Sequence, residues 1–134
     1  MIDVVSSGTA HTHLNRLNEW LTAEWGEVES FDNVPPPLLA IEGRKLLGGL
    51  MFSSFQKPDR EEIGLWINAL FVAPEHRRKG IGSLLIRAAE AEAARTGERE
   101  LFALTDIPKL YQRLGWQCVE SSSNGTVVGA LLEE

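Results

Sequence analysis

The feature that most constrains the fold is a segment in which an apolar strand, a short basic loop and a long helix follow one another directly. Residues 63–72 are rich in branched and aromatic side chains, as buried strands are. Pro74 ends this run, and residues 80–96 carry the apolar spacing of an amphipathic helix, with Gly97 placed as its C-terminal cap. A short strand is expected at 100–104. Because a strand–helix–strand crossover joins parallel strands, we predict that the two strands are parallel, with a right-handed connection.

Within helix 80–96, the apolar side chains predict which face packs on the sheet. The predicted core stripe consists of Ile81, Leu84, Leu85, Ala88 and Ala91. Opposite charges three residues apart, in Arg87 with Glu90 and in Glu92 with Arg95, are spaced for ion pairs on the outer surface of the helix.

The remaining elements follow from apolar runs separated by turn residues. They are a helix at 13–27, strands at 38–41 and 46–55, a short helix at 108–114, and strands at 116–121 and 126–132. Residues 122–125 (Ser-Ser-Asn-Gly) join the last two strands as a hairpin, since Asn-Gly is a strong turn signal. The predicted order is α-β-β-β-α-β-α-β-β. It describes an α/β (α+β) chain with a mixed sheet and helices on its faces.

Length and composition restrict the class of protein further. The 134 residues have the length of one domain, so residues 1–134 are expected to share one core. No apolar run approaches the roughly 20 residues of a membrane span, and no signal peptide is evident, so no membrane partner is expected. The single cysteine, Cys118, cannot form an internal disulfide; this favours a cytoplasmic protein, and Cys118 is expected half-buried in a strand. The net charge of −6 argues against a nucleic-acid partner.

The loop between the strand and the helix has the residues of a phosphate site. Gly80 and Gly82 let the backbone turn tightly and let a ligand approach the main chain. The first N–H groups of a helix have no internal acceptor, and three cations, Arg77, Arg78 and Lys79, lie beside them. Together these groups form a cradle for a pyrophosphate. The Walker spacing is missing, and leucine replaces the third glycine of a dinucleotide fingerprint, so neither of those patterns applies.

Two blocks of the chain resemble a known family. Residues 66–82 (Trp-x-x-x-Leu-Phe-Val-x-Pro-x-x-Arg-x-x-Gly-x-Gly) resemble the acetyl-CoA signature of the GNAT superfamily of N-acetyltransferases. Residues 110–116 (Leu-Tyr-Gln-Arg-Leu-Gly-Trp) resemble the family's Tyr-x-x-x-Gly-Phe/Trp element at the expected distance. The predicted order of elements matches the family over nearly the whole chain. The resemblance implies that acetyl-CoA (coenzyme A) is the cofactor, and that strand 63–72 separates from its parallel neighbour to open a V.

The resemblance also implies where the cofactor binds. The pantetheine arm would pair with the free backbone of Leu70, Phe71 and Val72. The pyrophosphate would accept hydrogen bonds from the backbone N–H groups of Arg78, Lys79, Gly80, Ile81 and Gly82, with Ser83 in the first helical turn. The side chains of Arg77 and Lys79 would supply positive charge.

Two residues are candidates for catalysis. Tyr111, the only tyrosine, matches the family's tyrosine near the sulfur, and the resemblance implies that its hydroxyl protonates the leaving thiolate. The alternative is a core tyrosine that packs the short helix on the sheet. Some relatives place a glutamate on the central strand as the base, whereas this strand has no carboxylate there. Asn68 cannot accept a proton at neutral pH, but it could orient a water molecule that does.

Five further positions are open to a role near the site. Many relatives carry an asparagine after strand 100–104 that binds the cofactor; here Thr105 or Lys109 could replace it, or the segment is a solvated loop. Trp66 is expected in the core, although it could wall the acceptor pocket. Trp20 and Trp25 are likewise expected in the core, although a cation could bind their faces.

No metal site is expected. His11 and His13 have no cysteine or carboxylate at ligand spacing. His76 is expected to be exposed on the basic loop.

The loop and the resemblance together predict an acetyl-CoA-dependent N-acetyltransferase. The amine of a small molecule would attack the thioester directly in a ternary complex, without a covalent enzyme intermediate. The acidic net charge favours a cationic acceptor. Two alternatives stay open: a non-catalytic acyl-CoA sensor of the same shape, which the missing carboxylate favours, and a toxin that acetylates charged tRNA, which the net charge disfavours. A homodimer is a possible assembly.

Overall fold

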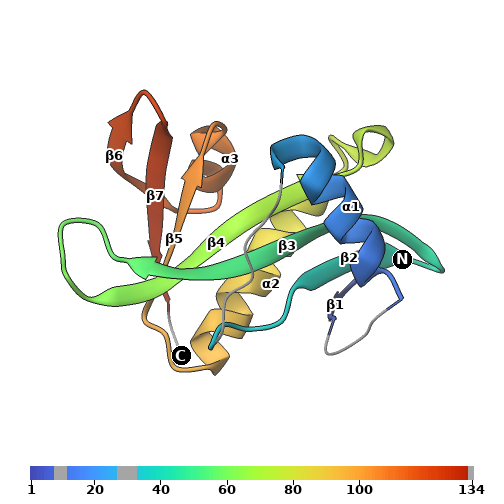
Figure 1. The fold of residues 1–134 in the computed structure, drawn as a ribbon, viewed down its shortest axis with the longest axis horizontal. Coiled ribbons are helices and arrows are strands. Elements are labelled where there is room, and N and C mark those ends of the chain that lie inside the picture. The colour runs from blue at the N-terminus through green and yellow to red at the C-terminus, as the bar shows by residue number, and fades with distance from the viewer. Residues whose placement is uncertain (8–11, 27–32, 133–134) are drawn as a thin grey trace.

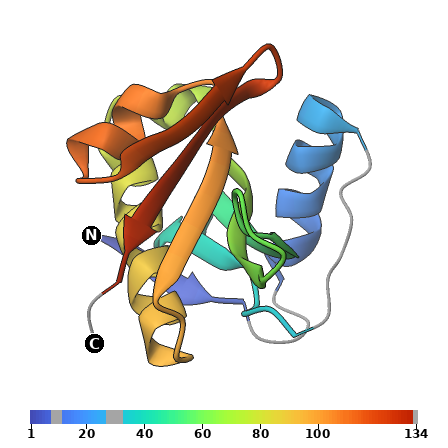
Figure 2. The same ribbon diagram turned by 90° about the vertical axis from the view of Figure 1, so that its left-hand side faces the viewer.

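The structure is a computed structural model that describes residues 1–7, 12–26 and 33–132. Over these ranges the chain forms one seven-stranded sheet with helices on both faces (Figure 1, Figure 2). Its elements are β1 (Ile2–Ser6), α1 (Leu14–Trp25), β2 (Leu38–Glu42), β3 (Lys45–Gln56), β4 (Ile63–Val72), η1 (Pro74–His76), α2 (Ile81–Arg95), β5 (Glu100–Thr105), α3 (Pro108–Arg113), β6 (Gln117–Ser122) and β7 (Gly125–Leu131). No helix in this part of the chain is both long enough and apolar enough to cross a membrane.

The strands lie in the order β1-β2-β3-β4-β5-β7-β6. β4 and β5 are parallel, which confirms the predicted crossover, and all the other neighbouring strands are antiparallel. The mixed α/β class is confirmed, and the elements from α1 onward begin and end within two residues of the predicted bounds. Residue 27, the predicted end of the first helix, lies outside the described residues.

The structure adds one strand that the sequence-based order lacks. All five residues of β1 pair antiparallel with β2, from Ile2 opposite Glu42 to Ser6 opposite Leu38. The predicted order, which begins with a helix, is therefore wrong at its first element. Five residues carry little strand pattern of their own, and the partner strand lies far along the chain, so tertiary pairing decides whether this strand forms.

Two apolar clusters hold the helices against the sheet, with α1 on one face and α2 and α3 on the other (Figure 2). The larger cluster includes Leu85 and Leu101, and the smaller one places Leu17 and Leu21 of α1 on Leu39; all five side chains are fully buried. Each buried leucine contributes about 1.5–3 kcal/mol of stability. The position of α1 matters for function, because this helix reaches the site described below.

The buried face of α2 differs from the predicted stripe. Leu84 is 43% exposed and Ala91 is exposed too. The buried residues are instead Ile81, Leu85, Ile86, Ala89 and Ala93. Apolar residues cover a wide arc of this alanine-rich helix, so the contact with the sheet selects the face. The predicted Arg87–Glu90 and Glu92–Arg95 ion pairs form, each between an exposed arginine and a largely buried glutamate.

Cys118 lies on β6, the last strand of the sheet, and all six residues of this strand are exposed. The expectation that Cys118 is half-buried is therefore wrong. Its sulfur accepts a hydrogen bond from the Nε2 of Gln112 at 3.0 Å. An edge strand has a neighbour on one side only, which leaves its side chains open to solvent.

Candidate active site

The parallel strands β4 and β5 separate well before they end. They share three register pairs, namely Leu65–Leu101, Trp66–Phe102 and Ile67–Ala103. β4 then continues to Val72 beside β3, and β5 continues to Thr105 beside β7. From residue 68 onward the edge of β4 that faces β5 is unpaired. This is the V-shaped opening that the family resemblance implies.

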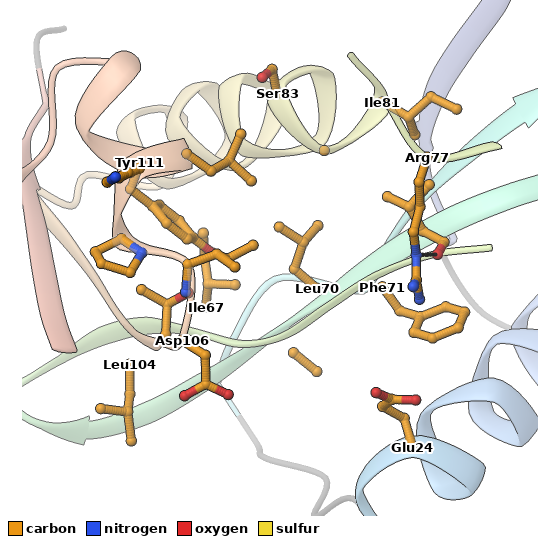
Figure 3. Close-up of a pocket in the computed structure, with 18 of the residues that line it drawn as sticks. Glu24, Ile67, Leu70, Phe71, Arg77, Ile81, Ser83, Leu104, Asp106 and Tyr111 are labelled. Carbon is orange, nitrogen blue, oxygen red and sulfur yellow. Dashed lines mark hydrogen bonds between the residues drawn. The ribbon is translucent and has the colours of Figure 1, made fainter. Parts of the chain in front are cut away.

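A cavity of about 1660 Å³ occupies this opening (Figure 3). Its walls come from the unpaired part of β4, from the loop and first turn of α2, and from the segment between β5 and α3. All the residues predicted for the site line this cavity, except Lys79. The fold thus brings the two family-like blocks together around one space, although they are well separated along the chain.

Asn68 lies where the pairing of β4 with β3 changes register. Ala69 is opposite Met51 and Ile67 is opposite Phe52, so Asn68 has no partner residue on β3. Such a bulge leaves an extra residue and bends the strand. The bend occurs where β4 leaves β5, and it leaves Asn68 exposed on the cavity wall.

The backbone at the start of α2 forms an anion site. Gly80 has a φ of +81°, in the left-handed region that favours glycine, and it caps the helix. Its carbonyl accepts the first helical hydrogen bond, from the N–H of Leu84 at 3.1 Å. The N–H groups of Ile81, Gly82 and Ser83 therefore have no acceptor within the helix, and the helix dipole adds partial positive charge there.

The charged side chains of this loop differ in what they can contact. The Nε of Arg77 donates a hydrogen bond to the carbonyl of Val72 at 2.8 Å, and its guanidinium carbon lies 5.4 Å from the centre of the Phe71 ring. Arg77 thus ties the loop to the end of β4. Arg78 lines the cavity, whereas Lys79 does not. His76 is half-buried rather than exposed, and its buried Nε2 has no hydrogen-bond partner among the described residues.

Tyr111 enters the cavity from α3. The side chain is 3% exposed, and in Figure 3 it extends towards Ile67, at the apex of the opening. Burial raises the pKa of its phenol well above the ordinary value, so the hydroxyl is protonated at neutral pH. Among the described residues no hydrogen-bond partner of this hydroxyl is found. Tyr111 thus belongs to the larger apolar cluster and also lines the cavity, with a protonated hydroxyl.

Several residues of the cavity wall were given no site role from the sequence, among them Glu24 and Asp106, and Trp25 was expected in the core or as an aromatic face for a cation. Glu24 and Trp25 come from the end of α1, and Asp106 follows β5. Both carboxylates lie on the side of β4 opposite α2 (Figure 3). Trp25 is 54% exposed and packs edge-on against Phe71, with ring centroids 6.3 Å apart. Asp106 had a usable signal, because ligands often bind beyond the carboxyl ends of strands, whereas nothing local marks Glu24.

The remaining candidate positions divide into two groups. Thr105 and Lys109 line the cavity, and the hydroxyl of Thr105 accepts a hydrogen bond from the N–H of Ile107 at 2.9 Å. Trp66 is not among the lining residues; its ring packs against Phe102 at 5.3 Å, and its indole N–H donates to the Phe55 carbonyl. His11 lies outside the described residues.

Comparison with known protein families gives one match over most of the chain. Residues 8–116 match the model described as the acetyltransferase (GNAT) family. A curated relative from Chlorobaculum tepidum, named as an uncharacterized N-acetyltransferase, is 41% identical over 54 residues. That match covers 40% of this chain and 35% of the relative, so the chain spans about a third of the relative's length.

Solved structures share the fold at low sequence identity. An N-acetyltransferase from Staphylococcus aureus Mu50 has a TM-score of 0.74 at 19% identity, with 99% of both chains covered. NAA60 from Arabidopsis thaliana, solved with acetyl-CoA, has a TM-score of 0.74 at 15% identity, with 98% of both chains covered. N-acetylglutamate synthase from Neisseria gonorrhoeae, solved with coenzyme A and N-acetyl-glutamate, has a TM-score of 0.72 at 16% identity, with 100% of this chain but 36% of that chain covered. With the family model matched over most of its length and this fold around its cavity, the chain belongs to the GNAT family of acetyltransferases.

Proposed function

We propose that residues 1–134 form a single N-acetyltransferase domain that transfers an acetyl group from acetyl-CoA to the amine of a small molecule. The observation that carries this proposal is the unpaired edge of β4, which runs inside the cavity from Asn68 to Val72 and points to the free amides of α2. A strand edge suits an amide-containing arm, and a helix N-terminus suits a pyrophosphate. The family relatives solved with coenzyme A or acetyl-CoA support the same ligand.

The cofactor end of the cavity is defined here as residues 70–72 and 77–83. The backbone of Leu70, Phe71 and Val72 would pair with the pantetheine arm, and the amides of residues 78–82, beside Ser83, would hold the pyrophosphate. Arg78 lines this end and supplies positive charge. Arg77 acts mainly by fixing the loop on β4, since its Nε is already bonded to Val72.

The acceptor end is defined as Glu24, Trp25 and Asp106. Its two carboxylates would attract the ammonium form of the acceptor, and Trp25 offers an aromatic face to a cation. β4 itself has no carboxylate, so Glu24, Asp106 or a water oriented by Asn68 would take the proton that the amine must lose before it attacks. The acceptor class is therefore a cationic small-molecule amine.

Bound acetyl-CoA supplies the acetyl thioester. The chain's residues would hold the amine nitrogen against the carbonyl carbon, so that a C–N bond forms as the C–S bond breaks. Free N–H groups on the unpaired edge of β4 would donate to the carbonyl oxygen as it gains negative charge. The nitrogen loses one proton and the sulfur gains one, which balances the transfer.

Tyr111 would donate a hydrogen bond to the sulfur as it leaves. The reference pKa of a phenol, about 10, is higher than that of a thiol, about 8.5, so complete proton transfer from phenol to thiolate costs about 2 kcal/mol. Burial raises the pKa of Tyr111 and adds to that cost. The hydroxyl therefore stabilises the developing thiolate mainly by sharing its proton in the transition state, within a site shielded from water.

The test combines binding with turnover. Calorimetry should show acetyl-CoA binding to both the native chain and Tyr111→Phe, because the substitution removes one hydroxyl only. Release of free thiol in the presence of a panel of amines should be rapid for the native chain. It should fall by about 10²-fold or more for Tyr111→Phe, the usual contribution of a positioned acid. Binding of acetyl-CoA without amine-dependent thiol release would support the sensor alternative and overturn the enzyme.

A further inference from the structure

The Tyr111 hydroxyl has no hydrogen-bond partner among the residues that the structure describes, so the contacts of the ring must hold this side chain in place. The ring packs against Trp116, with centroids 4.9 Å apart and planes at 60°. Both side chains are 3% exposed. An edge-to-face contact between buried rings stabilises their relative orientation.

The backbone brings Trp116 back onto Tyr111. Gly115 has a φ of +97°, which reverses the chain directly after α3. The N–H of Trp116 then donates to the carbonyl of Tyr111 at 3.1 Å. The two residues are thus joined through both backbone and ring, and the indole is turned towards α2.

The indole is anchored on α2 by a single carboxylate. The Nε1 of Trp116 donates to the Oε2 of Glu90 at 2.7 Å, a partly buried hydrogen bond across 26 residues. The other oxygen of Glu90 accepts from Arg87 at 2.9 Å. A hydrogen bond to a charged acceptor is stronger than one between neutral groups, and a phenylalanine at position 116 could not form it.

We propose that Trp116 is a positioning residue for Tyr111, and that Glu90 of α2 fixes Trp116 through its indole N–H. This inference rests on the proposed role of Tyr111. The cofactor would bind at the first turn of α2, and the reacting hydroxyl comes from α3. The Glu90–Trp116 bond links α2 to Trp116, and the backbone bond from Trp116 to Tyr111 continues this link to α3. It sets the distance between the pyrophosphate site and the hydroxyl, which must match the length of the pantetheine arm.

The test uses two single substitutions that remove the same bond from opposite sides. Glu90→Leu removes the acceptor, and Trp116→Phe removes the donor but keeps an aromatic ring beside Tyr111. Each should lower kcat about tenfold, with little change in the KM for acetyl-CoA, because a small displacement of a reacting group has a large effect on rate. The double variant should be no slower than the slower single variant, since only one bond is lost. Arg87→Gln is the matched control: it removes the other partner of Glu90 and should leave kcat within about twofold.

A spectroscopic readout separates positioning from loss of stability. Tyr111 is the only tyrosine, so selective ¹³C labelling of tyrosine gives one set of ring signals. In Glu90→Leu and Trp116→Phe these signals should shift, while acetyl-CoA still binds. They should stay in place in Arg87→Gln. Unchanged ring signals in Glu90→Leu would overturn the inference, whatever the rate.

The Tyr111→Phe background separates this inference from the proposed function. If the anchor acts through the hydroxyl, Glu90→Leu should cause no further loss of kcat in Tyr111→Phe. An equal tenfold loss in both backgrounds would show a general structural role and overturn the inference. If Tyr111→Phe is slow but Glu90→Leu and Trp116→Phe are not, the inference fails and the proposed acid stands. If Tyr111→Phe is as fast as the native chain, the proposed role of Tyr111 fails, and the inference fails with it.

Discussion

The cofactor end and the acceptor end of the cavity are built in different ways. The cofactor end comes from one continuous segment, residues 70–83, and its binding groups are mostly backbone amides held by a strand, a turn and a helix start. The acceptor end is assembled from α1 and from the segment after β5, and its binding groups are side chains. Backbone amides are present whatever side chains the first end carries, whereas binding at the second end depends on which side chains stand there.

The charges at the two ends differ as well. Free amides, the helix dipole and Arg78 make the cofactor end positive, in a chain whose net charge is −6. Glu24 and Asp106 bring negative charge to the acceptor end, while Lys109 and Arg113 also line the cavity. A substitution at one end should therefore change the affinity for one substrate only. Substitutions at each end, with both substrates varied, test this separation of the two binding sites.

The largest effect is expected for Gly82→Val. A Cβ at this position would meet only Leu110, at 3.5 Å, so the fold can accept a side chain there. The side chain would block the amides of the first turn, and the loss of two charge-assisted hydrogen bonds at about 1.5 kcal/mol each lowers affinity by about a hundredfold. Calorimetry with coenzyme A measures this loss. Ala91→Val, at an exposed position of the same helix, is the control and should bind normally. Normal binding by Gly82→Val would show that the amides are not the phosphate site.

At the acceptor end, Glu24→Gln and Asp106→Asn should each raise the KM for the amine about tenfold, because each removes one attractive charge at a few ångströms. The KM for acetyl-CoA should stay constant. Steady-state kinetics with both substrates varied would show this split. A larger change in the KM for acetyl-CoA than for the amine would contradict the division of the cavity into two ends.

Tyr111 lies where the two ends meet, and its titration should be visible in the stability of the fold. Its folded pKa is raised by burial, so its contribution to stability is fully present below the unfolded pKa of about 10 and is lost as pH rises above it. The free energy of unfolding should fall by about 1.4 kcal/mol per pH unit above pH 10 from this group alone. Urea denaturation between pH 9 and 11 measures the slope, and Tyr111→Phe should lack this part of it. Equal slopes in the two proteins would place the phenol in contact with water.

The smallest effect is expected for Lys79→Met. Lys79 does not line the cavity, and exposed charges at such a distance are screened by salt, so the affinity for coenzyme A should fall less than about threefold. Arg78→Met is the matched comparison, and it should lower the affinity for coenzyme A more than Lys79→Met does, because Arg78 lines the cavity. If Lys79→Met lowers the affinity for coenzyme A more than Arg78→Met does, then the total charge of the loop matters more for binding than the position of each side chain.

The sequence was most informative where a single segment makes both structure and site. Residues 63–72 form a strand at the predicted bounds, helix 80–96 differs by one residue at each end, and the glycine loop between them lies on the cavity as expected. These features depend on side-chain period, on proline, and on the left-handed conformation of Gly80, all of which act over a few residues. Tyr111 was found through its family-like block; its side chain is buried and lines the cavity, and its catalytic role stays a prediction.

The rest depended on contacts between distant segments. The composition of α2 allows more than one buried face, and the sheet selected Ile86 and Ala89 over Leu84 and Ala91. Glu24 and Asp106 line the same cavity because α1 packs on the sheet beside the opening between β4 and β5. The anchor from Glu90 to Trp116 likewise joins α2 to the segment between α3 and β6. Amino-acid order determines local backbone shape and the positive loop, because those arise from neighbouring residues. Only the tertiary structure decides which distant side chains line the same cavity, because that depends on how the helices pack on the sheet.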